Sequence, residues 1–117
     1  MRLSSLVFAC LVTVSVAPLA ADARSDAKKQ VEFGIAVSQR GLWREAIYRW
    51  ERAAQIDPTY AAAHNNLAIA YEHEGELDKA RAAYEKALEL EPNITFIKQN
   101  YELFKEINDR TTRPDTQ

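Results

Sequence analysis

Apolar and polar positions recur with a helical period along most of the chain. From residue 27 onward, apolar side chains return every three or four positions, which is the spacing of one face of an α-helix. Glycine or proline interrupts this pattern at Gly41, Pro58, Gly75 and Pro92. The pattern therefore predicts an all-α fold made of short amphipathic helices.

The helical pattern occurs twice along the chain, at a fixed offset. The offset that aligns Gly41 with Gly75 also aligns Pro58 with Pro92, without insertion or deletion. The other matched positions keep their size class, and pair Phe33 with Leu67, Gly34 with Ala68, Trp43 with Leu77, Ala46 with Ala80, Trp50 with Tyr84, Ala53 with Ala87 and Ile56 with Leu90. A fixed period of this kind is typical of a repeat architecture.

Each copy carries its own helix-ending signals. The glycine of each copy suits the left-handed conformation that ends a first helix. The proline ends the second helix, because proline has no N–H and disfavours helix at the residue before it. Thr59 and Asn93 follow these prolines, and we expect them to cap the next helices.

The second helix of each copy carries two alanines seven positions apart. Small side chains there allow two helices to approach closely, while Trp50 and Tyr84 fill the wider spaces between them. We expect Ala46, Ala53, Ala80 and Ala87 to lie in these close contacts.

These residues resemble the pattern of the tetratricopeptide repeat. The second copy, residues 61–94, carries the pattern at Leu67, Ala68, Tyr71, Gly75, Ala80, Tyr84, Ala87 and Pro92, and the first, residues 27–60, at Phe33, Gly34, Gly41, Ala46, Trp50, Ala53 and Pro58. His64, Gln30 and Val37 depart from it, since an aromatic residue is usual there. The resemblance implies two antiparallel helix-turn-helix hairpins stacked as a short right-handed solenoid.

A closing helix is expected over residues 94–108. Ile94, Ile97, Tyr101 and Phe104 share one arc at 100° per residue. Three further apolar residues, Phe96, Leu103 and Ile107, widen this arc beyond what one neighbouring helix covers. Residues 24–110 then form one repeat domain with a C-terminal capping helix, and residues 111–117 a disordered tail.

Residues 1–23 have the composition of an export signal. Arg2 precedes an uncharged run over residues 3–21, and Ala21-Asp22-Ala23 provides small residues for cleavage. We expect cleavage after Ala23, an exported protein in the periplasm or outside the cell, and no membrane span in the mature chain; an uncleaved anchor is the alternative. The single cysteine, Cys10, lies in the removed segment, so the mature chain has no disulfide.

The remaining composition favours binding over catalysis. Fifteen basic and 17 acidic residues are mixed to a net charge of −2, which lacks the basic stripe of a nucleic-acid surface. No catalytic set, cofactor motif or metal-ligand spacing is present. The two histidines are nine residues apart; His64 is interpreted as a packed, hydrogen-bonded side chain, and His73 as a residue of a helix's last turn.

The resemblance implies that first helices line a concave face that binds a protein or peptide. On this chain that face is expected to present Val31, Ile35, Ser38, Asn65, Asn66, Ile69 and Glu72. Only Asn66 matches the carboxylate-clamping subgroup of the family, so a carboxylate clamp is not expected. The groove is expected to suit an extended or helical peptide that docks apolar side chains, with Asn65 bonding its backbone. In the other interpretation, Ile35 and Ile69 belong to the core.

Two functions follow from these expectations. The first is a protein-binding adaptor or scaffold of the cell envelope that uses the concave face. The alternative is a self-association module that dimerises through Phe96, Leu103 and Ile107. An enzyme is the least favoured class, because no catalytic constellation is present.

Overall fold

Five α-helices make up residues 17–112, the part of the chain that this computed structural model describes. They are α1 (Ala17–Ser38), α2 (Trp43–Ile56), α3 (Ala61–His73), α4 (Leu77–Leu90) and α5 (Thr95–Thr112). Over these residues the fold is all-α, as the sequence predicts. Most of the predicted signal peptide and the last five residues lie outside the described part.

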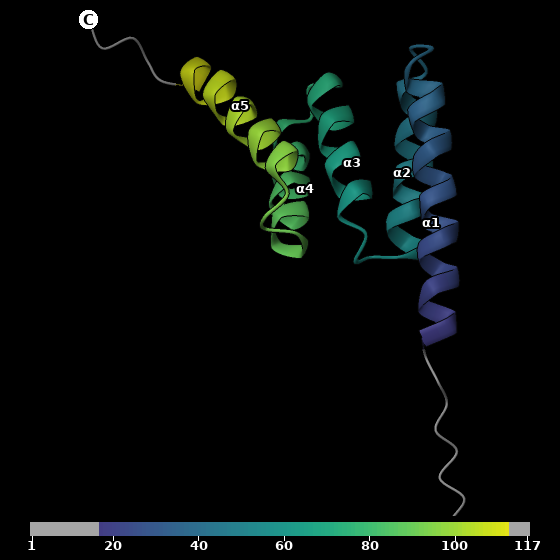
Figure 1. Ribbon diagram of the computed structural model, residues 1–117. Helices are drawn as coiled ribbons and strands as arrows, with labels where there is room; N and C mark the ends of the chain where they lie inside the picture. Colours follow the sequence, from purple (N-terminus) through teal and green to yellow (C-terminus); the bar gives the residue numbers. More distant parts are fainter. Residues whose placement is uncertain (1–16, 113–117) are drawn as a thin grey trace, which may run out of the picture.

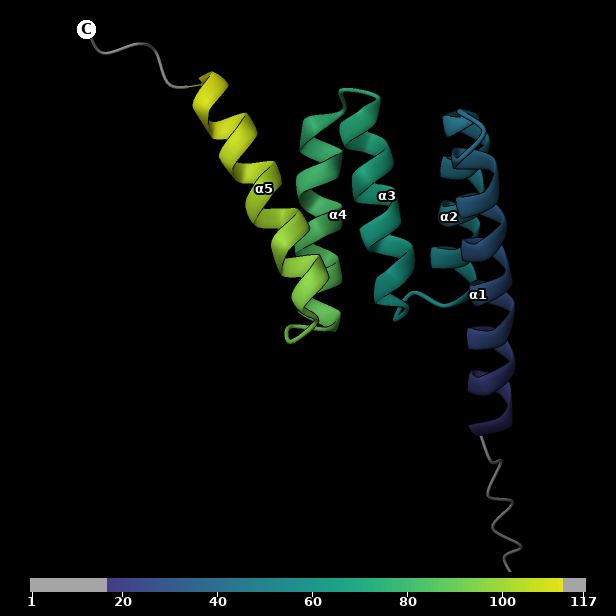
Figure 2. The ribbon, with the colours of Figure 1, turned by 45° about the horizontal axis from the view of Figure 1, so that its top comes forward.

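The helices form two hairpins and a closing helix (Figure 1). α1 packs along α2, α3 along α4, and α2 joins the two hairpins by contacting α3. α5 packs mainly on α4, while α1 also contacts α3. The first helices α1, α3 and α5 thus follow one another across the molecule, as Figure 2 shows after a 45° rotation. This is the helical-hairpin solenoid that the repeat predicts.

The helix boundaries repeat with the predicted period. α4 begins and ends one period after α2, and α5 begins one period after α3. α5 therefore occupies the register of the first helix of a third repeat. It continues to Thr112, four residues beyond the predicted end of the closing helix. α1 begins at Ala17, so the last seven residues of the predicted signal peptide are helical in this chain.

Glycine ends the first helices as expected, whereas the predicted caps are wrong. Gly41 and Gly75 have φ angles of 78° and 75°, the left-handed conformation that glycine adopts at little cost. The residue preceding α3 is Tyr60, which makes no side-chain cap. α5 begins only at Thr95, which places Asn93 outside the helix. Tyr60 and Ile94 are the residues directly before α3 and α5. Thr59 and Asn93 therefore lie one residue too early to cap these helices.

The close helix contacts are where the small residues predict them. Ala46, Ala53, Ala80 and Ala87 have no exposed surface, and Tyr84 is 2% exposed. The first hairpin uses a larger ring, because the Trp50 indole Nε1 donates a hydrogen bond to the Val31 carbonyl oxygen at 3.1 Å. A Cβ atom on Gly34 would lie 2.3 Å from that Nε1, so only glycine leaves room for tryptophan there.

The closing helix is held by a small apolar and aromatic interface. Ile97 is fully buried against Ala61 and Ala87. Phe104 is 1% exposed, and its ring centroid lies 5.4 Å from that of Tyr84. The predicted packing arc of this helix is therefore confirmed at Ile97 and Phe104, which are its buried residues.

Candidate functional site

A face of the first helices carries aliphatic side chains at one register position. α3 is buried on two flanks: Ala63 and Ala70 belong to the larger core, whereas Ala61 belongs to the cluster with Ile97 of α5. The arc between these flanks contains Asn66 and Ile69, which are partly exposed. Both residues are among those predicted for the concave face.

The repeat period places an aliphatic residue at the position of Ile69 on all three first helices. Ile35 on α1 is 40% exposed, and Leu103 on α5 is 56% exposed. We call Ile35, Ile69 and Leu103 the aliphatic ladder. The sequence analysis assigns Leu103 to a separate dimer surface. Leu103 lies one repeat period after Ile69, and this period is the sequence signal that could have placed it on the same face.

Two of the predicted binding residues are buried and do not face a ligand. Val31 is 4% exposed, because it lies in the contact between α1 and α2 where its carbonyl accepts the Trp50 hydrogen bond. Asn65 is 3% exposed, and its Oδ1 accepts a hydrogen bond from Asn100 Nδ2 at 3.3 Å. The expected bond from Asn65 to a ligand backbone is therefore wrong, since the closing helix takes that place.

The other predicted residues remain accessible beside the ladder. Ser38 is half-buried, and its hydroxyl donates to the Ile35 carbonyl oxygen at 2.8 Å. Glu72 is half-buried and accepts a hydrogen bond from the Tyr84 hydroxyl at 3.0 Å. Burial and the Glu72 carboxylate together raise the pKa of Tyr84 well above its ordinary value.

The exposed apolar residues of α5 belong to the ladder face. Phe96 and Ile107 are 52% and 50% exposed, and their places on the helix lie within about 40° of Leu103. They lie about a quarter of a turn from the buried Ile97 and Phe104. The predicted concave groove and the predicted dimer surface are thus continuous in register.

The side of α5 that a further helix would cover is polar. On α3 this side carries Ala61 and Asn65, which are buried against the closing helix. Thr95 and Gln99 occupy the same register on α5, and both are exposed. A polar outer side is what a capping helix of a repeat array requires. The apolar surface of α5 is consequently confined to the ladder face.

A hollow adjoins the ladder at the C-terminal end of α3. It has a volume of about 340 Å³ and is lined by Trp43, Ile69, Glu72 and His73. The Trp43 and His73 rings are stacked, with centroids 4.2 Å apart. Aromatic, aliphatic and acidic groups therefore meet at one end of the face.

The histidines have structural contacts. His64 Nε2 lies 2.9 Å from the Pro58 carbonyl oxygen, in line with its interpretation as a hydrogen-bonded side chain.

Within residues 17–112, no group of three or more His, Cys, Asp or Glu side chains is placed to hold a metal ion. In the same residues, no helix combines the length and apolar character that crossing a membrane requires.

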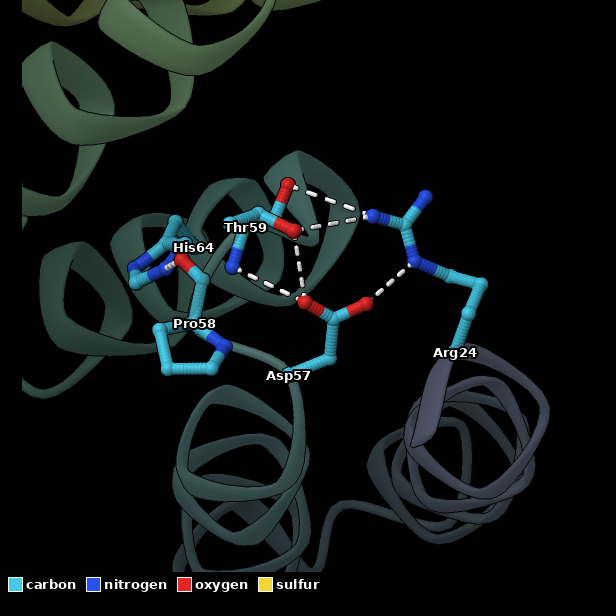
Figure 3. Close-up of polar contacts among 5 residues, drawn as sticks. All are labelled: Arg24, Asp57, Pro58, Thr59 and His64. Atoms are coloured by element: carbon cyan, nitrogen blue, oxygen red, sulfur yellow. Dashed lines mark hydrogen bonds and ion pairs between the residues drawn. The ribbon is translucent and has the colours of Figure 1, made fainter. Parts of the chain in front are cut away.

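A polar cluster fastens the start of the domain to the turn between the hairpins (Figure 3). The Arg24 guanidinium donates to the Asp57 carboxylate through Nε and to Thr59 Oγ1 at 3.2 Å. Thr59 donates its N–H and hydroxyl to Asp57 Oδ1, at 3.0 and 2.6 Å. Arg24 also lies over the Tyr60 ring, 4.7 Å from its centroid. Residues far apart in the chain thus fix the end of the first hairpin.

Comparison with known proteins agrees with this architecture. A family described as tetratricopeptide repeat matches residues 61–94, and one described as TPR repeat matches residues 36–74. Repeats of this kind generally mediate protein–protein interaction, and proteins built from them are typically non-catalytic adaptors.

Three relatives share parts of the chain. Type IV pilus assembly protein PilF of Pseudomonas aeruginosa is 30% identical over 94 residues, which is 79% of this chain and 37% of that protein. Protein O-mannosyl-transferase TMTC4 of Mus musculus is 36% identical over 55% of this chain and 9% of its own length. Uncharacterized protein ycf37 of Pyropia yezoensis is 48% identical over 38% of this chain and 25% of its own length. The chain thus spans less than two fifths of each relative.

Proposed function

Because the chain belongs to the tetratricopeptide repeat family, we propose that it is a non-catalytic, exported adaptor that holds a partner protein of the cell envelope. The partner binds across the concave face, on Ile35, Ile69 and Leu103. Ser38, Asn66 and Glu72 supply polar contacts beside this ladder.

The observation that carries this proposal is the exposure of the aliphatic ladder. Ile35 and Leu103 leave apolar area in water that a partner would cover, and Ile69 between them is half-buried against the core. Fully burying an exposed aliphatic side chain of this size contributes about 1.5–3 kcal/mol. The ladder residues are already partly buried, so each contributes only a part of this, and a few such anchors can carry most of the binding energy.

Two observations support export. The uncharged run over residues 3–21 ends at a small-residue cleavage site after Ala23. Arg24, the next residue, contacts Asp57 and Tyr60 of the folded domain, so the domain keeps its N-terminal contacts after cleavage at this site.

Of the three relatives, the one that shares most of this chain is described as a pilus assembly protein, which is consistent with a role in assembling envelope structures.

Affinity capture from the envelope fraction tests the adaptor function. We expect the double variant Ile35→Ser, Ile69→Ser to capture at least tenfold less of the partner proteins than the wild-type chain does. Its helix content, measured by circular dichroism, should be unchanged. Arg52→Glu is the matched control, because Arg52 is exposed on the second helix α2. Capture that survives the double serine change but fails with Arg52→Glu would place the partner on the outer helices instead.

A homodimer through Phe96, Leu103 and Ile107 is the second candidate. Their exposure of half or more favours a protein contact, and light scattering distinguishes a dimer from a monomer. A dimer that Leu103→Ser converts to monomer would assign the ladder face to a second copy of this chain.

A further inference from the structure

The outer side of α1 is uncovered, whereas the same side of α3 is buried. On α3 this side packs into the core together with residues of α2, at Ala63, Leu67 and Ala70. The equivalent residues of α1, one repeat period earlier, are all exposed: Lys29, Phe33 and Ala36. Within the described residues α1 lies at the end of the array, so no hairpin precedes it to cover this side (Figure 2).

Two charged residues lie on the same side of α1. Asp26 lies seven residues before Phe33 and Arg40 seven residues after it, so both return to within about 20° of the direction of Phe33. The helical path continues past Ser38, because the Arg40 N–H donates to the Val37 carbonyl oxygen at 3.1 Å. We call this side the end face, and it consists of Asp26, Lys29, Phe33, Ala36 and Arg40.

The centre of the end face has the composition of a protein contact. Phe33 is 48% exposed, and the Arg49 guanidinium of α2 lies 4.2 Å from its ring centroid. Arg49 Nε in turn donates to the Glu45 carboxylate at 2.8 Å, which fixes the guanidinium beside the ring. Aromatic residues and arginine are enriched in the cores of protein interfaces. The other end of the array, at Thr95 and Gln99, is polar as an uncovered end should be.

The charges of the end face have opposite signs on the two sides of Phe33. Asp26 and Arg40 lie at equal distances of about 10.5 Å along the helix from this ring. An antiparallel second copy therefore places its Arg40 opposite Asp26 and its Asp26 opposite Arg40. A parallel copy would bring like charges together. A purely acidic partner would attract Arg40 but repel Asp26, so the pattern favours a second copy of this chain.

Both charges remain available for such a contact. Arg40 forms no ion pair within residues 17–112. Asp26 Oδ1 lies 3.3 Å from Lys29 Nζ, and the two side chains are 61% and 72% exposed. An ion pair as exposed as this one stabilises little, so the Asp26 carboxylate can also receive the guanidinium of a second copy.

We propose that two copies of this chain associate through their end faces, with their α1 helices antiparallel. The two Phe33 rings meet at the two-fold axis, and an Asp26–Arg40 ion pair forms on each side of it, as in an isologous dimer. Ile35 lies about 160° around α1 from Phe33, so each copy keeps its aliphatic ladder open. The proposal therefore goes beyond the adaptor function and does not depend on it. Because Asp26 follows Ala23, cleavage after Ala23 leaves the end face complete.

Analytical ultracentrifugation of the protein purified from its host tests this association. We expect a dimer whose dissociation constant rises with salt. Phe33→Ser should raise this constant at least about tenfold, because the interface loses its buried ring. Lys28→Glu is the control and should leave it unchanged, since Lys28 is exposed about 140° around α1 from Phe33. A wild-type protein that stays monomeric at its highest soluble concentration would overturn the proposal.

Charge exchange tests the antiparallel pairing itself. Asp26→Arg and Arg40→Glu should each abolish the dimer, because each change brings like charges together at both ends of the interface. An equimolar mixture of the two variants should dimerise again, since every facing pair then has opposite charges. If the mixture stays monomeric while both variants keep the helix content of the wild-type chain, the antiparallel end-face dimer is wrong.

The outcome also separates this dimer from the other contacts of the molecule. A dimer that Leu103→Ser dissociates and Arg40→Glu leaves intact would use the ladder face, and the end-face proposal would fail. A monomeric protein that still captures envelope proteins through Ile35 and Ile69 would contradict the dimer and leave the adaptor function standing. An end-face dimer whose capture does not depend on these isoleucines would contradict only the adaptor function on the ladder face.

Discussion

At the scale of single residues, the two hairpins fill the same space between their helices with two different pairs of residues. The first hairpin combines Gly34 with Trp50, and the second has Ala68 and Tyr84 at the same positions. A Cβ atom on Gly34 would lie within 2.3 Å of the indole nitrogen. The larger ring therefore requires the smaller residue opposite it, and the hydrogen bond to the Val31 carbonyl satisfies the buried indole N–H.

This pairing predicts a coupled effect of two substitutions. Gly34→Ala should destabilise the fold by about 1–3 kcal/mol through overpacking, although alanine favours a helix more than glycine does. Combining it with Trp50→Tyr, which reproduces the pair of the second hairpin, should cost less than the sum of the single changes. Urea denaturation of the four proteins measures this coupling. Additive effects would mean that Gly34 and Trp50 do not share one space.

The Asp57 carboxylate predicts a dependence of stability on pH. Burial raises its pKa, but hydrogen bonds from Thr59 and Arg24 outweigh burial, and the net pKa is lowered. A carboxyl with a lowered pKa in the folded state stabilises the fold above its unfolded pKa, and this contribution is lost as the pH falls through the folded value. Asp57→Asn should therefore reduce stability at pH 7 and have a much smaller effect near pH 2. A difference that is equal at both pH values would exclude this carboxylate as the cause.

At the scale of helices, the contact between α3 and α4 depends on residues without side-chain bulk. Ala80 and Ala87 of α4 are fully buried, and Tyr84 lies between them. Tyr71 of α3 reaches back to Glu51 of α2, to which its hydroxyl donates at 2.9 Å. Burial and the Glu51 carboxylate raise the pKa of Tyr71 to about 12, so this bond persists at neutral pH. Close alanine contacts thus join the helices within a hairpin, and a polar contact adds to the packing between hairpins.

Enlarging an alanine in this contact should be costly. Ala80→Leu is expected to destabilise the protein by about 1–3 kcal/mol, because no space is available for the added atoms. Lys79→Leu is the matched control, since the Lys79 side chain is 63% exposed and its change should stay within about 0.5 kcal/mol. Thermal and urea unfolding compare the two variants. Equal losses would contradict the register of the repeat.

At the scale of the whole molecule, the array is short and its two ends differ. α5 presents a polar outer side at Thr95 and Gln99, which closes the array at that end. At the other end, Phe33 of α1 is 48% exposed and is covered in part by the Arg49 guanidinium, 4.2 Å from the ring centroid. The apolar surface that remains on α5 belongs to the ladder face, which is why we place partner binding there.

Export predicts the N-terminus of the protein in the cell. N-terminal sequencing of the protein recovered from the envelope fraction should begin at Arg24. Ala23→Leu should block this cleavage, because a bulky residue does not suit the site. Protein that begins at Met1 and is released only by detergent would instead indicate an uncleaved anchor.

The local pattern of the sequence was sufficient for the fold, because its signals act over a few residues. Gly41 and Gly75 end the first helices, and the alanines seven positions apart specify where helices can approach closely. Exposure of single residues was less predictable. Val31 and Asn65 have the register of ligand-facing residues, but both are buried by neighbours that the pattern of one helix does not contain.

Tertiary structure decided which surfaces remain in water. The sequence by itself determined the repeat period, the five helices and the fully buried alanines, since these follow from helical spacing and side-chain size. Only the packed chain brought Asn100 against Asn65, which the pattern of neither helix predicts. It also paired Arg24 of α1 with Asp57 at the end of α2, which lie 33 residues apart in the sequence. Such contacts depend on how helices from distant parts of the chain pack together, and the pattern of a single helix does not specify this.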